Sequence, residues 1–147
     1  MKINHYTEQY AIYGMLFSLS NRIQTIGDKE FSDITMKQHF LVAALELFTE
    51  PPSLKQMGEL IGCSYQNVKR MADQLEKKGY LIIQQDKTDK RKLLLVQTGK
   101  VKQLVEETGE AGIKFMNSLY QGISQEDLII TLETLKKMDR NIGGHIE

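Results

Sequence analysis

One stretch constrains the fold more than any other: LKQMGELIGCSYQNVKRMADQL, residues 54–75. Two helices can cross at a steep angle over a three-residue turn only if a small residue lies where they touch. Gly58 fills that place, and Gly62 supplies the left-handed conformation that the turn needs. Apolar residues are expected along the contact: Met57, Ile61, Cys63, Val68 and Met71. The stretch therefore predicts a tightly packed helix pair.

The second helix of this pair has two different faces. Ser64 is placed to cap its start, and we expect it to run to about Lys78. The buried face would hold Val68, Met71, Ala72 and Leu75, and the other face shows Gln66, Asn67, Lys69, Arg70, Asp73, Gln74 and Lys77. Any amphipathic helix has a polar side, but Asn, Gln and Arg also pair with base edges. With its two glycines, the segment resembles the helix-turn-helix of DNA-binding proteins.

A hairpin is predicted directly after the helix pair. LIIQQ (81–85) and LLLVQ (93–97) have the length and composition of strands, and charged turn-forming residues separate them. Those residues are Asp86, Lys87, Thr88, Asp89, Lys90, Arg91 and Lys92. A helix-turn-helix followed by a hairpin is a winged helix, whose tip can place arginine in a narrow minor groove.

The rest of the chain is predicted to be helical. The expected helices cover 5–26, ended by Gly27-Asp28; Thr35 to about Phe48, stopped by Pro51-Pro52; 54–61; 100–121; and about 125–140. Thr35 with Gln38, Ser53 with Gln56, and Ser124 with Asp127 have capping-box spacing. The helix after Thr35 is apolar over much of its surface, so we expect it to be deeply buried. The fold class is mainly α with a small β-hairpin.

Here the chain resembles the MarR family of bacterial transcriptional regulators. The resemblance runs from the helix-turn-helix through QLEKKGYL (74–81) to DKTDKRKLLLVQT-G (86–99). The family typically shows D-x-R-D-x-R at the wing tip, then leucines and T-x-x-G. Asp86, Asp89 and Arg91 match that tip. Thr88 stands where the family usually has arginine, which removes part of the expected salt-bridge network, and Gly99 comes early.

The resemblance implies a homodimer. Residues 1–34 would be an N-terminal dimerisation helix, 35–99 a winged helix-turn-helix domain, and 100–147 C-terminal dimerisation helices. Two such domains would bind a pseudo-palindrome in double-stranded DNA, and we expect a repressor whose affinity falls when a small molecule binds. The terminal helices also carry more apolar residues than solvated helices need: Tyr6, Tyr10, Tyr13, Phe17, Leu128, Ile129, Leu132, Leu135 and Met138.

Two sets of site residues follow. The expected DNA contacts are Ser64, Tyr65, Gln66, Asn67, Lys69, Arg70 and Gln74 on the second helix, and Lys87, Lys90 and Arg91 in the hairpin. Aromatic residues would line a pocket for an aromatic or phenolic effector: Tyr10, Tyr13, Phe17 and Phe40. A packed core explains the same aromatic residues, together with Tyr6, Phe31 and Phe48.

Charge distribution favours a nucleic-acid partner although the 147-residue chain has net charge zero. Residues 53–100 hold ten Lys/Arg and five Asp/Glu, a net charge of +5, and the remainder carries −5. The rival interpretation is a winged helix that binds protein and not DNA. It requires an apolar recognition face, which Gln66, Asn67 and Arg70 do not provide. We find no catalytic set, so an enzyme is not expected.

Cofactors and metals are not expected either. His5, His39 and His145 are scattered, and a metal site needs a cluster. The single cysteine, Cys63, excludes an internal disulfide and is interpreted as a packing residue in the turn, with a redox role as the alternative. The N-terminus lacks the apolar run of a signal peptide, and no stretch of about 18 apolar residues occurs. We therefore expect a cytoplasmic protein.

Overall fold

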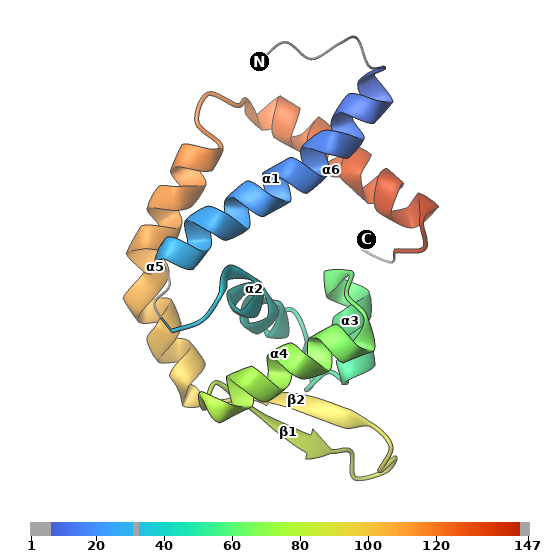
Figure 1. Ribbon diagram of the computed structural model, residues 1–147, viewed down its shortest axis with the longest axis vertical. Coiled ribbons are helices and arrows are strands. Elements are labelled where there is room, and N and C mark those ends of the chain that lie inside the picture. Colours follow the sequence, from blue (N-terminus) through green and yellow to red (C-terminus); the bar gives the residue numbers. More distant parts are fainter. Residues whose placement is uncertain (1–6, 31–32, 145–147) are drawn as a thin grey trace. The chain divides into compact units, whose positions relative to one another are not determined.

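The computed structural model describes residues 7–30 and 33–144, and the chain forms two compact units, residues 1–39 and 40–147. Each unit is described by itself. Predictions that involve His5, Tyr6, Phe31 and His145 lie outside the described residues. The elements are α1 (Glu8–Glu30), α2 (Met36–Leu45), α3 (Leu54–Ile61), α4 (Tyr65–Lys77), β1 (Leu81–Gln85), β2 (Leu93–Gln97), α5 (Gly99–Leu119) and α6 (Gln125–Asn141). The fold is therefore mainly helical with one hairpin, as predicted (Figure 1).

The first helix ends later than predicted. Gly27-Asp28 was expected to stop it, but α1 continues to Glu30. Gly27 is buried, and a Cβ there would lie 2.5 Å from the Met36 sulfur. Asp28 accepts a hydrogen bond from the Met36 backbone N–H at 2.6 Å. The glycine thus allows close approach of the following segment, and the aspartate caps α2.

The second helix begins as predicted but ends early. Thr35 and Gln38 exchange hydrogen bonds of 3.2 and 3.0 Å, which is the expected capping box. The helix ends at Leu45, and the predicted continuation to Phe48 is wrong. The N–H groups of Glu46, Leu47 and Phe48 bond to carbonyls three residues back, so the chain tightens before it reaches the prolines.

Burial of α2 is one-sided, which corrects the prediction that it is deeply buried. Leu41, Val42, Ala44 and Leu45 are buried, whereas Phe40 is 55% exposed. Leu47, in the turn that follows, is 74% exposed. The apolar composition of this segment therefore serves more than the core of its own chain.

The helix-turn-helix forms as predicted. Gly62 has φ +68°, and the Cys63 N–H donates to the Gly58 carbonyl at 2.9 Å. A Cβ at Gly58 would lie only 2.7 Å from the Cys63 carbonyl oxygen, so only glycine fits without movement of the turn. Ser53 and Gln56 form the capping box of α3, and Ser64 caps α4. Ile61 and Cys63 are half-buried, and Met57 is fully buried.

The hairpin packs beside α4 within the second unit (Figure 1). β1 and β2 pair antiparallel, from Leu81 opposite Gln97 to Gln85 opposite Leu93. The segment before α3 adds one bridge on the other side of β2: Ser53 pairs with Leu94, and the Leu95 N–H donates to the Pro52 carbonyl at 2.8 Å. The core of the winged unit includes Leu41, Leu54, Met57, Val68, Leu75, Leu81, Leu95 and Val101.

The last two helices match the predicted ranges to within two residues, and Ser124 caps α6 as expected. Their apolar residues are largely exposed in the single chain. Each of the following is at least 39% exposed: Val105, Ile113 and Met116 on α5, Tyr120 at its C-cap, and Ile129, Ile130, Leu132 and Leu135 on α6.

Candidate nucleic-acid interface

The outward face of α4 carries the polar residues that the sequence predicts. Val68, Met71, Ala72 and Leu75 bury one side of the helix. At 3.6 residues per turn, Gln66 and Arg70 lie one above the other on the opposite side, and Lys77 continues the same line. Tyr65, Gln66, Asn67, Arg70 and Gln74 are all exposed. The face can therefore present an amide and a guanidinium to neighbouring base pairs.

Lys69, one of the predicted DNA contacts, is paired with an acidic residue of its own helix. Its ammonium forms a close ion pair with Asp73, four residues further along α4. The two side chains are 35% and 42% exposed, so water screens the pair and its contribution to stability is small. In the free chain Lys69 is thus directed along the helix, and a phosphate would have to compete with Asp73 for it.

The start of α4 is built for an anion. The Ser64 hydroxyl accepts from the Asn67 N–H at 3.3 Å, which fixes the first turn. The positive end of the helix dipole and the remaining first-turn N–H groups favour a phosphate there. Ser64 therefore acts mainly as a cap that shapes this end.

The wing tip, residues 86–92, is braced by Asp86. Its Oδ1 accepts from the Thr88 N–H at 2.7 Å, from the Thr88 hydroxyl at 2.6 Å and from the Asp89 N–H at 2.8 Å. The Asp86 N–H donates to the Lys92 carbonyl at 3.0 Å and closes the turn. Thr88, the departure from the family pattern, therefore supplies a hydroxyl to the brace in place of an ion pair.

Arg91 is tethered at its base and free at its end. The Asp89 carboxylate accepts from the Arg91 backbone N–H at 3.1 Å and lies 3.4 Å from its Nε. The Arg91 side chain is nevertheless 94% exposed. Lys87, Lys90 and Lys92 are exposed around it. The tip thus presents several cations from a turn that its aspartates hold in shape.

The hydrogen bonds to Asp86 lower its pKa from 3.8 to about 2. The Thr88 hydroxyl contributes most, followed by the backbone N–H groups of Asp89 and Thr88. Because the pKa is lowered on folding, the brace contributes fully above the ordinary pKa. That contribution is lost as the pH falls through about 2.

Replacing Thr88 with valine is expected to raise the pKa of Asp86 toward 3.8, because the strongest donor to its carboxylate is removed. The carboxyl carbon shift, followed by NMR from neutral to acidic pH, measures this. Thr88→Ser keeps the hydroxyl and should keep the low pKa. If Asp86 has the same pKa in Thr88→Val as in the parent, the Thr88 hydroxyl does not stabilise the Asp86 carboxylate.

The predicted effector residues fall into different units. Tyr10, Tyr13 and Phe17 lie on α1 and are at least 60% exposed, and the rings of Tyr13 and Phe17 meet edge to face at 5.1 Å. Phe40 belongs to the second unit. The effector pocket stays a prediction.

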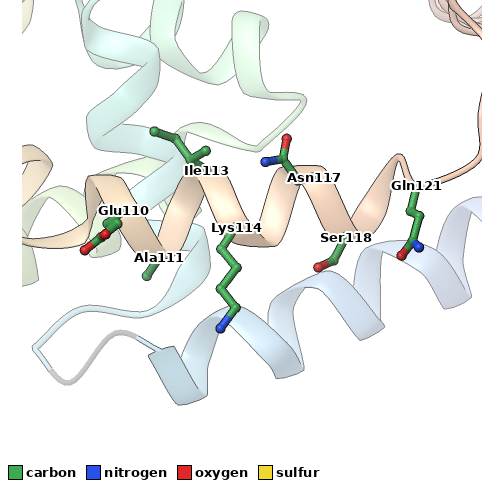
Figure 2. A pocket seen from close by; sticks show the side chains of 7 residues that line it. All are labelled: Glu110, Ala111, Ile113, Lys114, Asn117, Ser118 and Gln121. Carbon is green, nitrogen blue, oxygen red and sulfur yellow. The ribbon is translucent and has the colours of Figure 1, made fainter.

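A separate depression lies on α5, and Figure 2 shows its seven lining side chains. Its lining combines the polar or charged side chains of Glu110, Lys114, Asn117, Ser118 and Gln121 with the apolar Ala111 and Ile113. None of the four predicted aromatic residues lines it. This depression is therefore separate from the aromatic residues predicted for the effector.

Thr98 and Lys100 were not predicted as functional residues. The Thr98 hydroxyl bonds to the carbonyls of Gly79 and Tyr80, and the Lys100 ammonium bonds to that of Lys78. The only sequence signal for them was Thr98 before Gly99, which marks a helix start and not a contact with α4.

Comparison with known proteins gives a family match for part of the chain. Residues 34–93 match the model of the MarR family. The match covers the helix-turn-helix and the wing tip. It begins one residue before Thr35, the cap of α2.

Several solved structures share the fold over nearly the whole chain. A MarR protein from Peptoclostridium difficile is 20% identical, with a TM-score of 0.81 over 97% of this chain and 92% of that one. Bordetella bronchiseptica BpsR, whose DNA binding is regulated by 6-hydroxynicotinic acid, is 22% identical, with a TM-score of 0.76 over 94% and 98%. Staphylococcus aureus MepR, solved as a DNA complex, is 18% identical, with a TM-score of 0.77 over 93% and 99%.

Two kinds of feature are absent from the described residues. In residues 7–30 and 33–144, no group of three His, Cys, Asp or Glu side chains is placed to hold a metal ion. Across the same ranges, no helix has the length and apolarity needed to cross a bilayer.

Proposed function

We propose that the protein is a transcriptional regulator that binds double-stranded DNA through α4 and the wing. The observation that carries this proposal is the pairing, in one winged unit, of a polar exposed face on α4 with a braced tip that presents Arg91. An exposed Gln66–Arg70 pair suits base edges, and an exposed arginine on a stiff turn suits a narrow minor groove.

Each element would have its own role on DNA. Gln66 would pair with adenine and Arg70 with guanine, because their side chains match the donor and acceptor patterns of those bases in the major groove. Lys87 and Lys90 would contact phosphates, which position the protein without reading sequence. Asn67 and Tyr65, in the first turn of α4, would contact the same groove.

A homodimer is supported by the apolar residues that a single chain leaves exposed. Tyr10, Tyr13 and Phe17 on α1, with Ile129 and Leu132 on α6, are each more than half exposed. Monomers rarely expose apolar patches of this kind. A two-fold dimer would place two α4 helices in successive major grooves, about 34 Å apart, and would thus read a pseudo-palindrome.

Regulation by a small molecule is supported by solved structures of the same fold. DNA binding of BpsR is regulated by 6-hydroxynicotinic acid, and PcaV from Streptomyces coelicolor was solved with its natural ligand. We propose that an aromatic or phenolic effector binds this protein. It would favour a dimer whose α4 spacing no longer fits the operator, and the protein would act as a repressor.

The test is selection of DNA from a random library by the full-length protein, followed by gel-shift titration at several salt concentrations. We expect a two-fold symmetric consensus. The log of the affinity should fall with log salt concentration with a slope of about −0.9 per phosphate neutralised. A protein-interaction module would instead select no consensus.

Two variants separate the proposed roles on the selected DNA. Arg70→Ala should cost about 1–3 kcal/mol and relax the preference at one base pair in each half-site. Lys87→Ala should weaken binding to all DNA sequences equally. It should also reduce the slope of log affinity against log salt concentration by about one per wing. If both variants lose affinity in the same sequence-independent way, α4 does not read bases.

A further inference from the structure

Thr98 joins the wing to α5 and also holds the end of α4. Its hydroxyl lies 2.6 Å from the Gly79 carbonyl oxygen and 3.1 Å from that of Tyr80. The same oxygen accepts from the Lys100 N–H at 3.3 Å as the cap of α5. The Thr98 N–H donates to the Tyr80 carbonyl at 3.0 Å. One side chain thus connects the residues that directly follow α4 to the first turn of α5.

Lys100 makes a second connection between the same two helices. Its ammonium donates to the Lys78 carbonyl at 2.8 Å and lies 4.3 Å from the centre of the Tyr80 ring. Lys78 is the C-terminal cap of α4, where the helix dipole is negative and favours a cation. Tyr80 is only 3% exposed, so its ring is a fixed platform.

Beyond this junction, the large apolar side chains of α5 are more exposed. Val101 and Leu104, in its first two turns, are buried, whereas Val105 is 55% exposed and Ile113 is 66% exposed. The part of α5 that packs on the winged core is therefore short. The bonds from Thr98 and Lys100 are directional, and they lie at the end of α5 where Val101 and Leu104 are buried.

We propose that Thr98 and Lys100 are positioning residues that fix the direction of α4 relative to α5. This rests on the proposed function, in which α5 enters the dimer and α4 enters the groove. If α5 carries the dimer interface, the angle between the two helices sets the spacing of the two α4 helices. The contacts of Thr98 and Lys100, which we call the α4–α5 clasp, would therefore select operators by half-site spacing.

The first test measures the clasp without DNA. Spin labels on cysteines at Lys77 of α4 and Asn117 of α5, in full-length protein with Cys63→Ala, report the distance between the helices. Mixing with unlabelled protein removes distances between subunits. We expect one narrow distance in the parent and in Thr98→Ser, and a broad distribution in Thr98→Val and Lys100→Met. Lys102→Met, two residues from Lys100 on the same helix, is the matched control and should stay narrow.

The second test measures DNA spacing. On the selected DNA, base pairs are added or removed between the half-sites. The parent should show a sharp affinity optimum at one spacing. Lys100→Met and Thr98→Val should lose roughly tenfold in affinity for DNA with that spacing, as expected for lost hydrogen bonds. Their affinities for DNA with neighbouring spacings should differ less from one another. Lys102→Met should follow the parent.

The two tests fail in different ways. Unchanged distances in Lys100→Met overturn the clasp, and they do so even if Thr98→Val does not fold. Broad distances with an unchanged spacing profile overturn its role in operator choice. If the parent selects no DNA, the proposed function fails, and the distance measurement still decides whether the clasp orients α4.

Discussion

Reversing the charge of Arg91 is expected to weaken DNA binding by about 10- to 1000-fold, the largest effect on affinity of any single side chain in the wing. Arg91→Glu removes a cation from the minor groove and places an anion near phosphates, and a dimer does so twice. The loss should occur on all sequences, since a single arginine in this groove mainly senses width and potential.

This effect should be separable from any effect on folding. The Arg91 side chain is 94% exposed, and its side-chain contact is the 3.4 Å ion pair with Asp89. The free energy of unfolding should therefore change by less than about 0.5 kcal/mol. Lys137→Glu makes the same change of net charge on α6 and should bind DNA like the parent. Gel-shift titration of both variants on the selected DNA decides the role of the wing. Parent-like affinity in Arg91→Glu would exclude it.

Replacing Gly58 with alanine is expected to destabilise the protein by about 3 kcal/mol. The new Cβ would lie 2.7 Å from the Cys63 carbonyl oxygen, which is backbone and cannot rotate away. Either the turn moves or the two helices separate, and both break the 2.9 Å bond from the Cys63 N–H to the Gly58 carbonyl. Urea denaturation at a fixed protein concentration measures the loss, because a dimer's stability depends on concentration.

Gly99→Ala is the matched control for that experiment. Gly99 is also helical, and a Cβ there meets no atom within 4 Å. Its replacement should change stability by no more than about 0.5 kcal/mol. Equal losses in the two variants would show that the steep helix crossing does not depend on a small residue at position 58.

The helix-turn-helix and the wing were predictable because each has strong local rules. Gly62 must adopt a left-handed conformation, Ser53 and Ser64 cap their helices, and both strands were placed at their observed residues. The C-terminal ends of α1 and α2 were not predictable in this way. Gly27 next to Asp28 looks like a helix stop, but this glycine serves a close contact with Met36, and sequence does not distinguish the two uses.

The site shows the same division. The exposed face of α4 follows from helical periodicity, so Gln66 and Arg70 could be predicted. Lys69 and Thr88 each have several possible partners nearby in the sequence. Only the structure shows that Lys69 pairs with Asp73 and that the Thr88 hydroxyl bonds to Asp86. The contacts of Thr98 with Gly79 and Tyr80 join residues 18 or 19 positions apart, and no local pattern marks them.

The bridge between the segment before α3 and β2 has a consequence for solubility. A two-stranded hairpin normally offers an open edge to which a strand of another molecule can add. Here the outer side of β2 is met by Pro51, Pro52 and Ser53. The prolines have no N–H, and the Ser53 N–H is bonded to Gln56 Oε1 at 2.9 Å. The segment accepts the Leu95 N–H, and Pro51, Pro52 and Ser53 offer no free N–H of their own, so a further strand cannot add at this edge of β2.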